Sequence, residues 1–207
     1  MKGLYAIIDR SVSPVPLIDL AKEYFEGGTR VVQLRDKKRL ESAHSRESFW
    51  KTAKQIVALK QQYSFLFIVN DDLEAVREVR ADGIHVGKDD PSIQECRQFL
   101  GREKLIGYSS HSLEEAIEAE KNGADYVAFG AIFPTPTKGP GHPVQGIEKL
   151  REVVKSVSIP VVAIGGIDRG NIKEVLSTGV ASVAMISALA KAKDRVTEAR
   201  FFGDLFQ

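Results

Sequence analysis

The chain has 207 residues, of which 43% are hydrophobic and 28% charged, so it has the length and the apolar content for one domain with a substantial core. Its 29 basic and 28 acidic residues leave a net charge of +1. This balance, without a basic patch or an acidic tail, argues against nucleic acid or a membrane surface as a partner. Any bound anion must therefore meet a local site made of backbone amides and a few cations.

The lone cysteine and the first residues bear on the cellular compartment. Cys96 has no second cysteine for an internal disulfide or a cysteine-based zinc site, as expected in a reducing cytoplasm. The chain runs from Met1 directly into a strand-like segment, without the pattern of a signal peptide. Its longest apolar stretches, near 159–164 and 180–190, are too short or too interrupted to span a bilayer. We expect a cytoplasmic protein, and a homo-oligomer remains open.

Short runs rich in Val, Ile, Phe and Tyr alternate with amphipathic stretches along the whole chain. Several of these runs are continuously apolar, which is typical of parallel strands covered on both faces. In chain order, each predicted strand and the helix after it are Leu4–Ile8 and Leu17–Glu26, Val31–Leu34 and Glu47–Gln62, Phe65–Val69 and Asp72–Arg80, Gly83–Val86 and Ser92–Leu100, Leu105–Tyr108 and Ser112–Asn122, Tyr126–Phe129 and Gly146–Val157, Pro160–Ile164 and Arg169–Ser177, and Ser182–Ile186 and about 188–206. Eight such repeats predict a single (β/α)₈ TIM barrel over residues 1–207, with an open doubly wound sheet as the alternative.

Local signals support several of these boundaries. Ser112 stands three residues before Glu115, which is the spacing of a capping box at a helix start. Gly123 and Gly179 each end a predicted helix just before a strand, where the chain needs a left-handed residue.

Cationic side chains follow the second predicted strand, at the edge of a barrel where chemistry takes place. Arg35 and Lys37 are two positions apart, so they project to the same side of an extended segment and can hold one anion. The alternative is a surface ion pair of these cations with Asp36 or Glu41.

Two carboxylates follow the third and fourth predicted strands. Asp71 and Asp90 end strands that lie roughly 4.8 Å apart in a sheet, so both can reach one hard cation. Carboxylates at strand ends also serve as helix N-caps, a role open to Asp71 or Asp72.

The last two predicted strands end in small residues. Gly165 and Gly166 precede a helix start expected near Asp168, which would place free backbone amides at a helix N-terminus. Ser187 follows the eighth strand and completes the phosphate site that recurs there in barrels. The alternative for the glycine pair is a tight turn.

Two histidines and one loop leave roles open. His111 follows the fifth strand and could act as a base, orient the loop of Ser109 or bind a backbone carbonyl. His85 lies within a short strand, so we expect a structural role. Residues 134–143 after the sixth strand either fold over a ligand, bringing His142 near the site, or form a plain surface loop.

Seven motifs occur in order between about Leu4 and Leu189. They are VQLRDK at 32–37, ND at 70–71, ADGIHVG at 81–87 with Asp90, SSHSLEEA at 109–116, GADYV at 123–127, PTPTK at 134–138 and PVVAIGGI at 160–167. Together these motifs resemble the thiamin phosphate synthase (thiamin-phosphate pyrophosphorylase) family. The chain departs from the family's usual pattern at Ile8, where threonine is usual, and after Lys138, where a lysine-aspartate pair and a double proline are missing.

The resemblance implies a transferase that joins hydroxymethylpyrimidine diphosphate to a (carboxy)thiazole phosphate, with Mg²⁺, and releases pyrophosphate and thiamin phosphate. By position in the motifs, the pyrimidine diphosphate would be held by Gln33, Arg35, Lys37, Asn70 and Lys138, and Ser109 would contact the pyrimidine or the departing pyrophosphate. The thiazole phosphate would be held by Thr135, Thr137, Gly166, Ile186 and Ser187. Asp71 and Asp90 would bind the magnesium, and Lys138, Ser109 and Arg35 would be catalytic.

The residue types suit this chemistry. A diphosphate leaves readily only when its charge is neutralised, which Mg²⁺ with Arg35, Lys37 and Lys138 would do. The aminopyrimidine can then carry positive charge at its methylene carbon until the thiazole nitrogen attacks. The reaction needs no protein nucleophile, and the sequence contains no recognisable nucleophile motif.

Two alternatives share parts of the pattern. Thiazole tautomerase, a sister barrel without metal chemistry, shares the helix start after Ser112, a histidine like His111 and the glycine pair, but not the metal pair. A non-catalytic barrel that binds thiamin phosphates would keep the thiazole phosphate site without turnover. The ionic residues at Arg35, Lys37, Asp71 and Asp90 favour the synthase over both.

Overall fold

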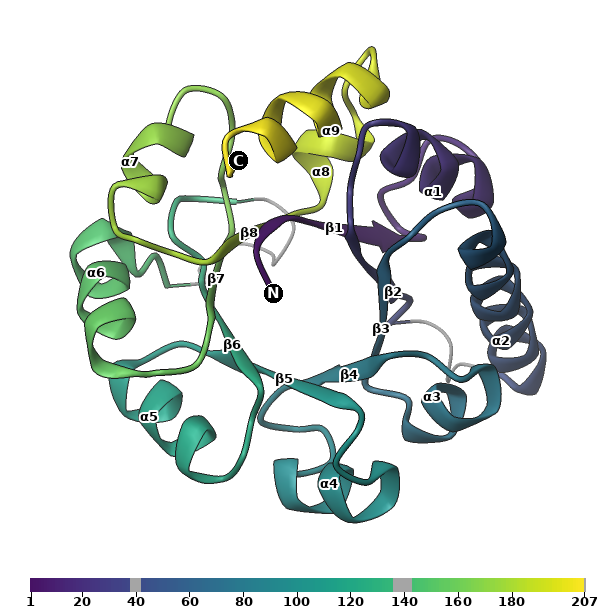
Figure 1. Cartoon of the computed structure of the whole chain (residues 1–207), viewed down its shortest axis with the longest axis horizontal. Helices are drawn as coiled ribbons and strands as arrows, with labels where there is room; N and C mark the ends of the chain where they lie inside the picture. The colour runs from purple at the N-terminus through teal and green to yellow at the C-terminus, as the bar shows by residue number, and fades with distance from the viewer. Residues whose placement is uncertain (38–41, 136–142, 207) are drawn as a thin grey trace.

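The computed structural model describes residues 1–37, 42–135 and 143–206, and its eight parallel strands close into a barrel in the order β1-β2-β3-β4-β5-β6-β7-β8. The strands are β1 Gly3–Asp9, β2 Val31–Arg35, β3 Leu66–Asn70, β4 Gly83–Val86, β5 Leu105–Ser110, β6 Tyr126–Gly130, β7 Val161–Ile164 and β8 Ser182–Met185. The helices that surround them (Figure 1) are α1 Leu17–Glu26, α2 Ala43–Ala58, α3 Leu73–Val79, α4 Ile93–Leu100, α5 Leu113–Lys121, α6 Gly146–Ser156, α7 Ile172–Leu176, α8 Ser187–Ala190 and α9 Arg195–Asp204, with a 3₁₀ turn at Leu59–Gln61. The predicted (β/α)₈ barrel is confirmed.

Closure excludes the open doubly wound sheet. The first and last strands pair in parallel, in a register that runs from Gly3 opposite Ser182 to Ala6 opposite Met185. A further bond joins them, because the Ser182 hydroxyl donates to the carbonyl of Gly3 over 2.5 Å. Both termini of the sheet are thus paired, and the barrel has no free edge.

Two helix predictions were wrong in detail. The stretch expected to be one helix over about 188–206 divides into α8 and α9, because Asp194 accepts the amide of Thr197 over 2.9 Å and starts a new helix. The helix expected near Asp168 begins only at Ile172. A turn intervenes, in which the side chain of Asn171 accepts the Asp168 amide over 2.9 Å.

The predicted caps are mostly confirmed. Ser112 accepts the amide of Glu115 over 3.1 Å, while the Glu115 carboxylate accepts the amide of His111 over 2.7 Å. In the expected capping box the Glu115 carboxylate would accept the amide of the N-cap Ser112; here it accepts the amide of the preceding residue. Gly123 and Gly179 have φ angles of 91° and 86°, the left-handed conformation that the sequence indicated.

Two apolar cores fill the fold, one between barrel and helices and one inside the barrel. The inner core consists of Tyr5, Ile7, Val31, Ile68, Tyr126, Ala128, Val162 and Ala184. Gly107 makes room for it, since a Cβ there would lie 2.0 Å from the Tyr126 ring. Two positions beyond Val31 and Ile68, on the same side of each strand, stand Gln33 and Asn70. The interior therefore changes from apolar to polar toward the carboxyl ends of the strands.

No helix among the described residues has both the length and the apolar character needed to cross a membrane.

Candidate active site

A cavity of about 290 Å³ opens at the carboxyl ends of the strands. It brings together these residues predicted from the sequence: Gln33, Arg35, Lys37, Asn70, Asp71, Asp90, Ser109 and Ile186. They come from strands β2 to β5 and from the residue after β8, so only the closed barrel makes them neighbours. The volume suits a small-molecule ligand.

Three cationic side chains line this cavity, Arg35, Lys37 and Lys88, and the first two are paired with carboxylates of other strands. Arg35 donates to Asp9 at the end of β1, and Lys37 donates to Asp71 over 2.8 Å. Asp36 instead accepts from Arg10 over 2.6 Å, so the alternative of an ion pair between Asp36 and Arg35 or Lys37 was wrong, and Glu41 lies outside the described residues. The Lys37 side chain is 54% exposed, so it lies at the mouth, where its ammonium can also reach a ligand.

Asp71 and Asp72 divide the two roles that the sequence left open. Asp72 caps α3 by accepting the amide of Ala75 over 2.9 Å. Asp71 has a φ of 60°, in the left-handed region, and its carboxylate lies in the cavity wall. Burial raises the pKa of Asp71, the Lys37 ammonium opposes this shift, and the Asp90 carboxylate adds to it. Two carboxylates thus lie close together where charge repulsion makes a cation favourable.

Asp90 reaches this position through its own loop. Its carboxylate accepts the amide of Gly87 over 2.8 Å, which folds the segment after β4 back toward the cavity. Within the described ranges no cluster of three or more His, Cys, Asp or Glu side chains could hold a metal ion. Asp71 and Asp90 fit the smaller donor set that Mg²⁺ prefers, in which waters and substrate phosphate oxygens complete the shell.

Asn70 supplies a hydrogen-bond donor without an acceptor. Its side chain is 5% exposed, and its Nδ2 makes no hydrogen bond within the part of the chain that the structure describes. An unsatisfied buried donor costs about 1–3 kcal/mol. Because Asn70 lines the cavity, an oxygen of a bound ligand would remove that cost.

Sequence reasoning missed two residues of the cavity wall, Tyr5 and His85, and the buried Tyr126 that contacts both. His85 was expected to be structural, but its Nε2 lies 2.9 Å from the Ser109 hydroxyl and its ring lines the cavity. A signal was present, because His85 pairs with Asn70 in the sheet and alternates with the apolar Ile84 and Val86.

A second, smaller cavity of about 60 Å³ lies beside the first, at the ends of β7 and β8. The predicted residues that line it are Thr135, Gly166, Ile186 and Ser187, together with Gly165. Ser187 is the first residue of α8, so the cavity meets the N-terminus of a short helix, as in the phosphate sites of many barrels. Thr137, Lys138 and His142 lie outside the described residues.

The backbone itself requires a glycine at position 166. Its φ is 67°, and a Cβ would lie 2.6 Å from the carbonyl oxygen of Pro134. The glycine pair therefore packs against the segment after β6, so the turn that the sequence left as an alternative is also present.

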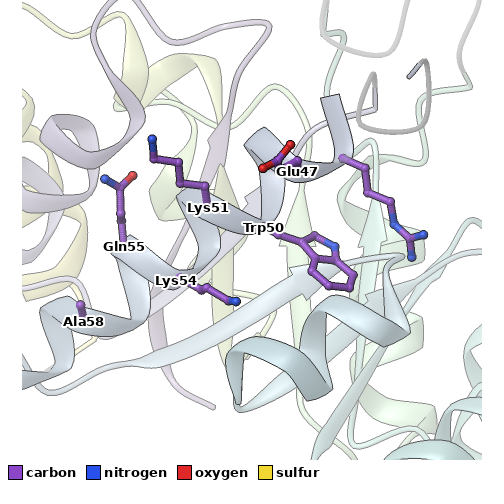
Figure 2. A pocket seen from close by; sticks show the side chains of 7 residues that line it. Glu47, Trp50, Lys51, Lys54, Gln55 and Ala58 are labelled. Carbon is purple, nitrogen blue, oxygen red and sulfur yellow. The ribbon is translucent and has the colours of Figure 1, made fainter. Parts of the chain in front are cut away.

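A third and larger cavity, of about 740 Å³, lies outside the barrel on α2. Figure 2 shows that its labelled lining side chains, Glu47, Trp50, Lys51, Lys54, Gln55 and Ala58, all project from this one helix. It includes no residue from a strand end, where barrel enzymes place their chemistry. The two cavities at the strand ends are the better candidates.

The fold and the two cavities define a (β/α)₈-barrel enzyme with its site at the carboxyl ends of the strands. A profile of the thiamine monophosphate synthase family matches residues 4–189. The chain belongs to this family.

Individual relatives agree with this assignment. Thiamine-phosphate synthase of Shouchella clausii is 41% identical over 192 residues, which are 92% of this chain and 90% of that protein. The Pyrococcus horikoshii thiamine-phosphate synthase is 44% identical over 197 residues, 94% and 91% of the two chains. The solved structure of thiamine phosphate pyrophosphorylase from Pyrococcus furiosus superposes with a TM-score of 0.86 at 39% identity, over 99% of this chain and 95% of that one. The tautomerase and the non-catalytic binder gain no support.

Proposed function

We propose that the protein condenses hydroxymethylpyrimidine diphosphate with (carboxy)thiazole phosphate to give thiamin phosphate and pyrophosphate. The observation that carries this proposal is the larger of the two cavities at the strand ends, in which Arg35 and Lys37, the carboxylates of Asp71 and Asp90 and the unsatisfied Asn70 amide converge. This set suits a diphosphate, because it offers positive charge and donors for the oxygens together with ligands for a cation.

The smaller cavity suits the second substrate. Gly166, Thr135 and Ser187 offer backbone and hydroxyl groups rather than charged side chains, which is sufficient for one phosphate at a helix N-terminus. Ile186 and Ala184 line both cavities. We therefore propose that the methylene carbon and the thiazole nitrogen react in the space between the two phosphate positions, next to these apolar side chains.

The chain contributes to the reaction by position and charge. Arg35 is held by Asp9 and Lys37 by Asp71, so both cations are oriented before substrate binds and stabilise the negative charge that develops on the leaving diphosphate. Asp71 and Asp90 would hold Mg²⁺, which supplies further neutralisation of the diphosphate when bound. Ser109 and Gln33 line the same cavity and would orient the pyrimidine, and Lys138 would act on the diphosphate.

This proposal places the enzyme in the cytoplasm, in accord with its lone, buried Cys96, whose thiol pKa is raised to about 11 mainly by burial. The test is incubation with both substrates and Mg²⁺, followed by assay of pyrophosphate and thiamin phosphate. Both products should appear in equal amounts, and EDTA should stop their formation. Metal-independent isomerisation of the carboxythiazole phosphate alone, or binding without turnover, would contradict the proposal.

A further inference from the structure

A chain of hydrogen bonds crosses the interior of the barrel. Gln33 Nε2 donates to the Tyr5 hydroxyl over 2.8 Å, and this hydroxyl lies 2.9 Å from that of Tyr126. The Tyr126 hydroxyl is 3.1 Å from Nδ1 of His85, whose Nε2 is 2.9 Å from the hydroxyl of Ser109. These five side chains belong to five different strands, and both ends of the chain, Gln33 and Ser109, line the larger cavity.

The middle of this chain is closed to solvent. Tyr5 and Tyr126 are each 1% exposed, and burial raises the pKa of both hydroxyls well above the usual range. Both hydroxyls therefore keep their protons, and each has one proton to donate. Gly107 maintains this arrangement, because any side chain there would displace the Tyr126 ring.

Counting protons gives the chain a direction. Tyr5 accepts from Gln33, and its only other hydrogen-bond partner among the described residues is Tyr126, so it must donate to Tyr126 or leave a buried proton unsatisfied. Tyr126 then donates its own proton to Nδ1 of His85. A neutral His85 consequently carries its proton on Nε2 and donates to Ser109.

We propose that Tyr5, Tyr126 and His85 are positioning residues that hold Ser109 as a hydrogen-bond acceptor toward the protein, so that its own proton points at the substrate. This inference rests on the proposed function. It requires that the substrate atom at Ser109 is an acceptor, either a pyrimidine ring nitrogen or a diphosphate oxygen, and not the exocyclic amino group.

The first test needs no substrate. The chain has four histidines, and ¹⁵N NMR of histidine-labelled protein, with the His85 signal assigned from a His85→Asn variant, reports which ring nitrogen carries the proton. In the parent protein the His85 proton should be on Nε2. In Tyr126→Phe the second tautomer should appear, because the Tyr126 hydroxyl no longer donates to Nδ1.

Tyr24→Phe is the matched control, because the Tyr24 hydroxyl is also buried but has no hydrogen-bond partner within the described residues. It should leave the His85 tautomer unchanged. A His85 proton on Nδ1 in the parent protein, or equal effects of Tyr24→Phe and Tyr126→Phe, would overturn the proposal.

The second test is a double-mutant cycle on the Kd of hydroxymethylpyrimidine diphosphate, measured by calorimetry. Ser109→Ala should weaken binding about tenfold and Tyr126→Phe about fivefold, while the double variant should be no weaker than Ser109→Ala, since Tyr126 acts through Ser109. Losses that multiply would refute the coupling. Inorganic pyrophosphate and unphosphorylated hydroxymethylpyrimidine, titrated separately, show which acceptor Ser109 contacts. A protein without condensation activity would refute the proposed function but would leave the NMR result intact.

Discussion

The two halves of the barrel mouth offer different groups for the anions that the proposed function requires. The half formed by β2 to β5 uses charged side chains, and Arg35 and Lys37 there are each held by a carboxylate from another strand. The half formed by β7 and β8 uses small residues, a close backbone approach at Gly166 and the start of a short helix. The difference follows the expected ligands. A diphosphate that must leave needs strong neutralisation, whereas a phosphate that only anchors its substrate needs backbone donors.

The largest effect is expected when the carboxylates of Asp71 and Asp90 are removed from the charged half of the mouth. Asp71→Asn and Asp90→Asn should each lower kcat/KM by roughly 10²-fold at fixed Mg²⁺ and raise the Mg²⁺ concentration needed for half activity. The double variant should fall well short of the product of the single losses, because both residues serve one ion.

Pyrophosphate release across a Mg²⁺ series provides the measurement for this pair. Asp19→Asn removes one exposed carboxylate on α1 and should behave as the parent protein does. Calorimetry of the thiazole phosphate alone should give an unchanged Kd in all variants, and loss of that binding would show that the two halves are not independent.

The second prediction concerns the removal of a cation, Lys138. Lys138→Met should lower turnover by about 10²-fold while Tm changes little, since the sequence predicts a loop at Lys138 and a loop lysine contributes little packing. Lys51→Met, which removes an exposed lysine of α2, is the control. Single-turnover assays and calorimetry give the two quantities. Near-normal turnover of Lys138→Met would remove this residue from the site.

A third change tests whether the small-residue half depends on its backbone. Gly166→Val should destabilise the fold by about 2–4 kcal/mol, because its Cβ would lie 2.6 Å from the carbonyl oxygen of Pro134 at a positive φ. Urea denaturation measures the loss. Gly203→Ala is the control, because its added Cβ meets nothing within 4 Å. A stable Gly166→Val protein with weakened thiazole phosphate binding would show that the glycine serves the ligand alone.

The smallest effect is expected for Ser187, in the half of the mouth formed by β7 and β8. Ser187→Ala should raise the KM for the thiazole phosphate about tenfold, as for one lost hydrogen bond to an anion, and leave the KM for the pyrimidine diphosphate unchanged. Steady-state kinetics with each substrate varied in turn would show this. Ser177→Ala, an exposed serine on the outer side of the same region, should alter neither KM. An equal rise in both values would mean that Ser187 does not separate the two substrates.

The sequence by itself determined the barrel and most of the polar residues that line the two cavities at its mouth. Alternating apolar runs and amphipathic stretches predicted all eight strands, because each strand is buried on both faces and each helix on one. The polar residues at strand ends were identifiable from position, since parallel strands bring their carboxyl ends to one edge. The family motifs then named Gln33, Asn70 and Ser109, which the barrel brings into one cavity.

Only the tertiary structure decided how these residues are partnered. The pairing of Arg35 with Asp9 and the buried chain from Gln33 to Ser109 join different strands of the barrel. The division of roles between Asp71 and Asp72 was decided by the turn after β3, where Asp71 has a φ of 60° and Asp72 caps α3. Such pairings depend on barrel closure and on the stagger between strands, which set the side chains that meet across the interior. A sequence pattern predicts the face of a strand on which a residue lies, but it does not predict the side chain that the residue contacts across the barrel.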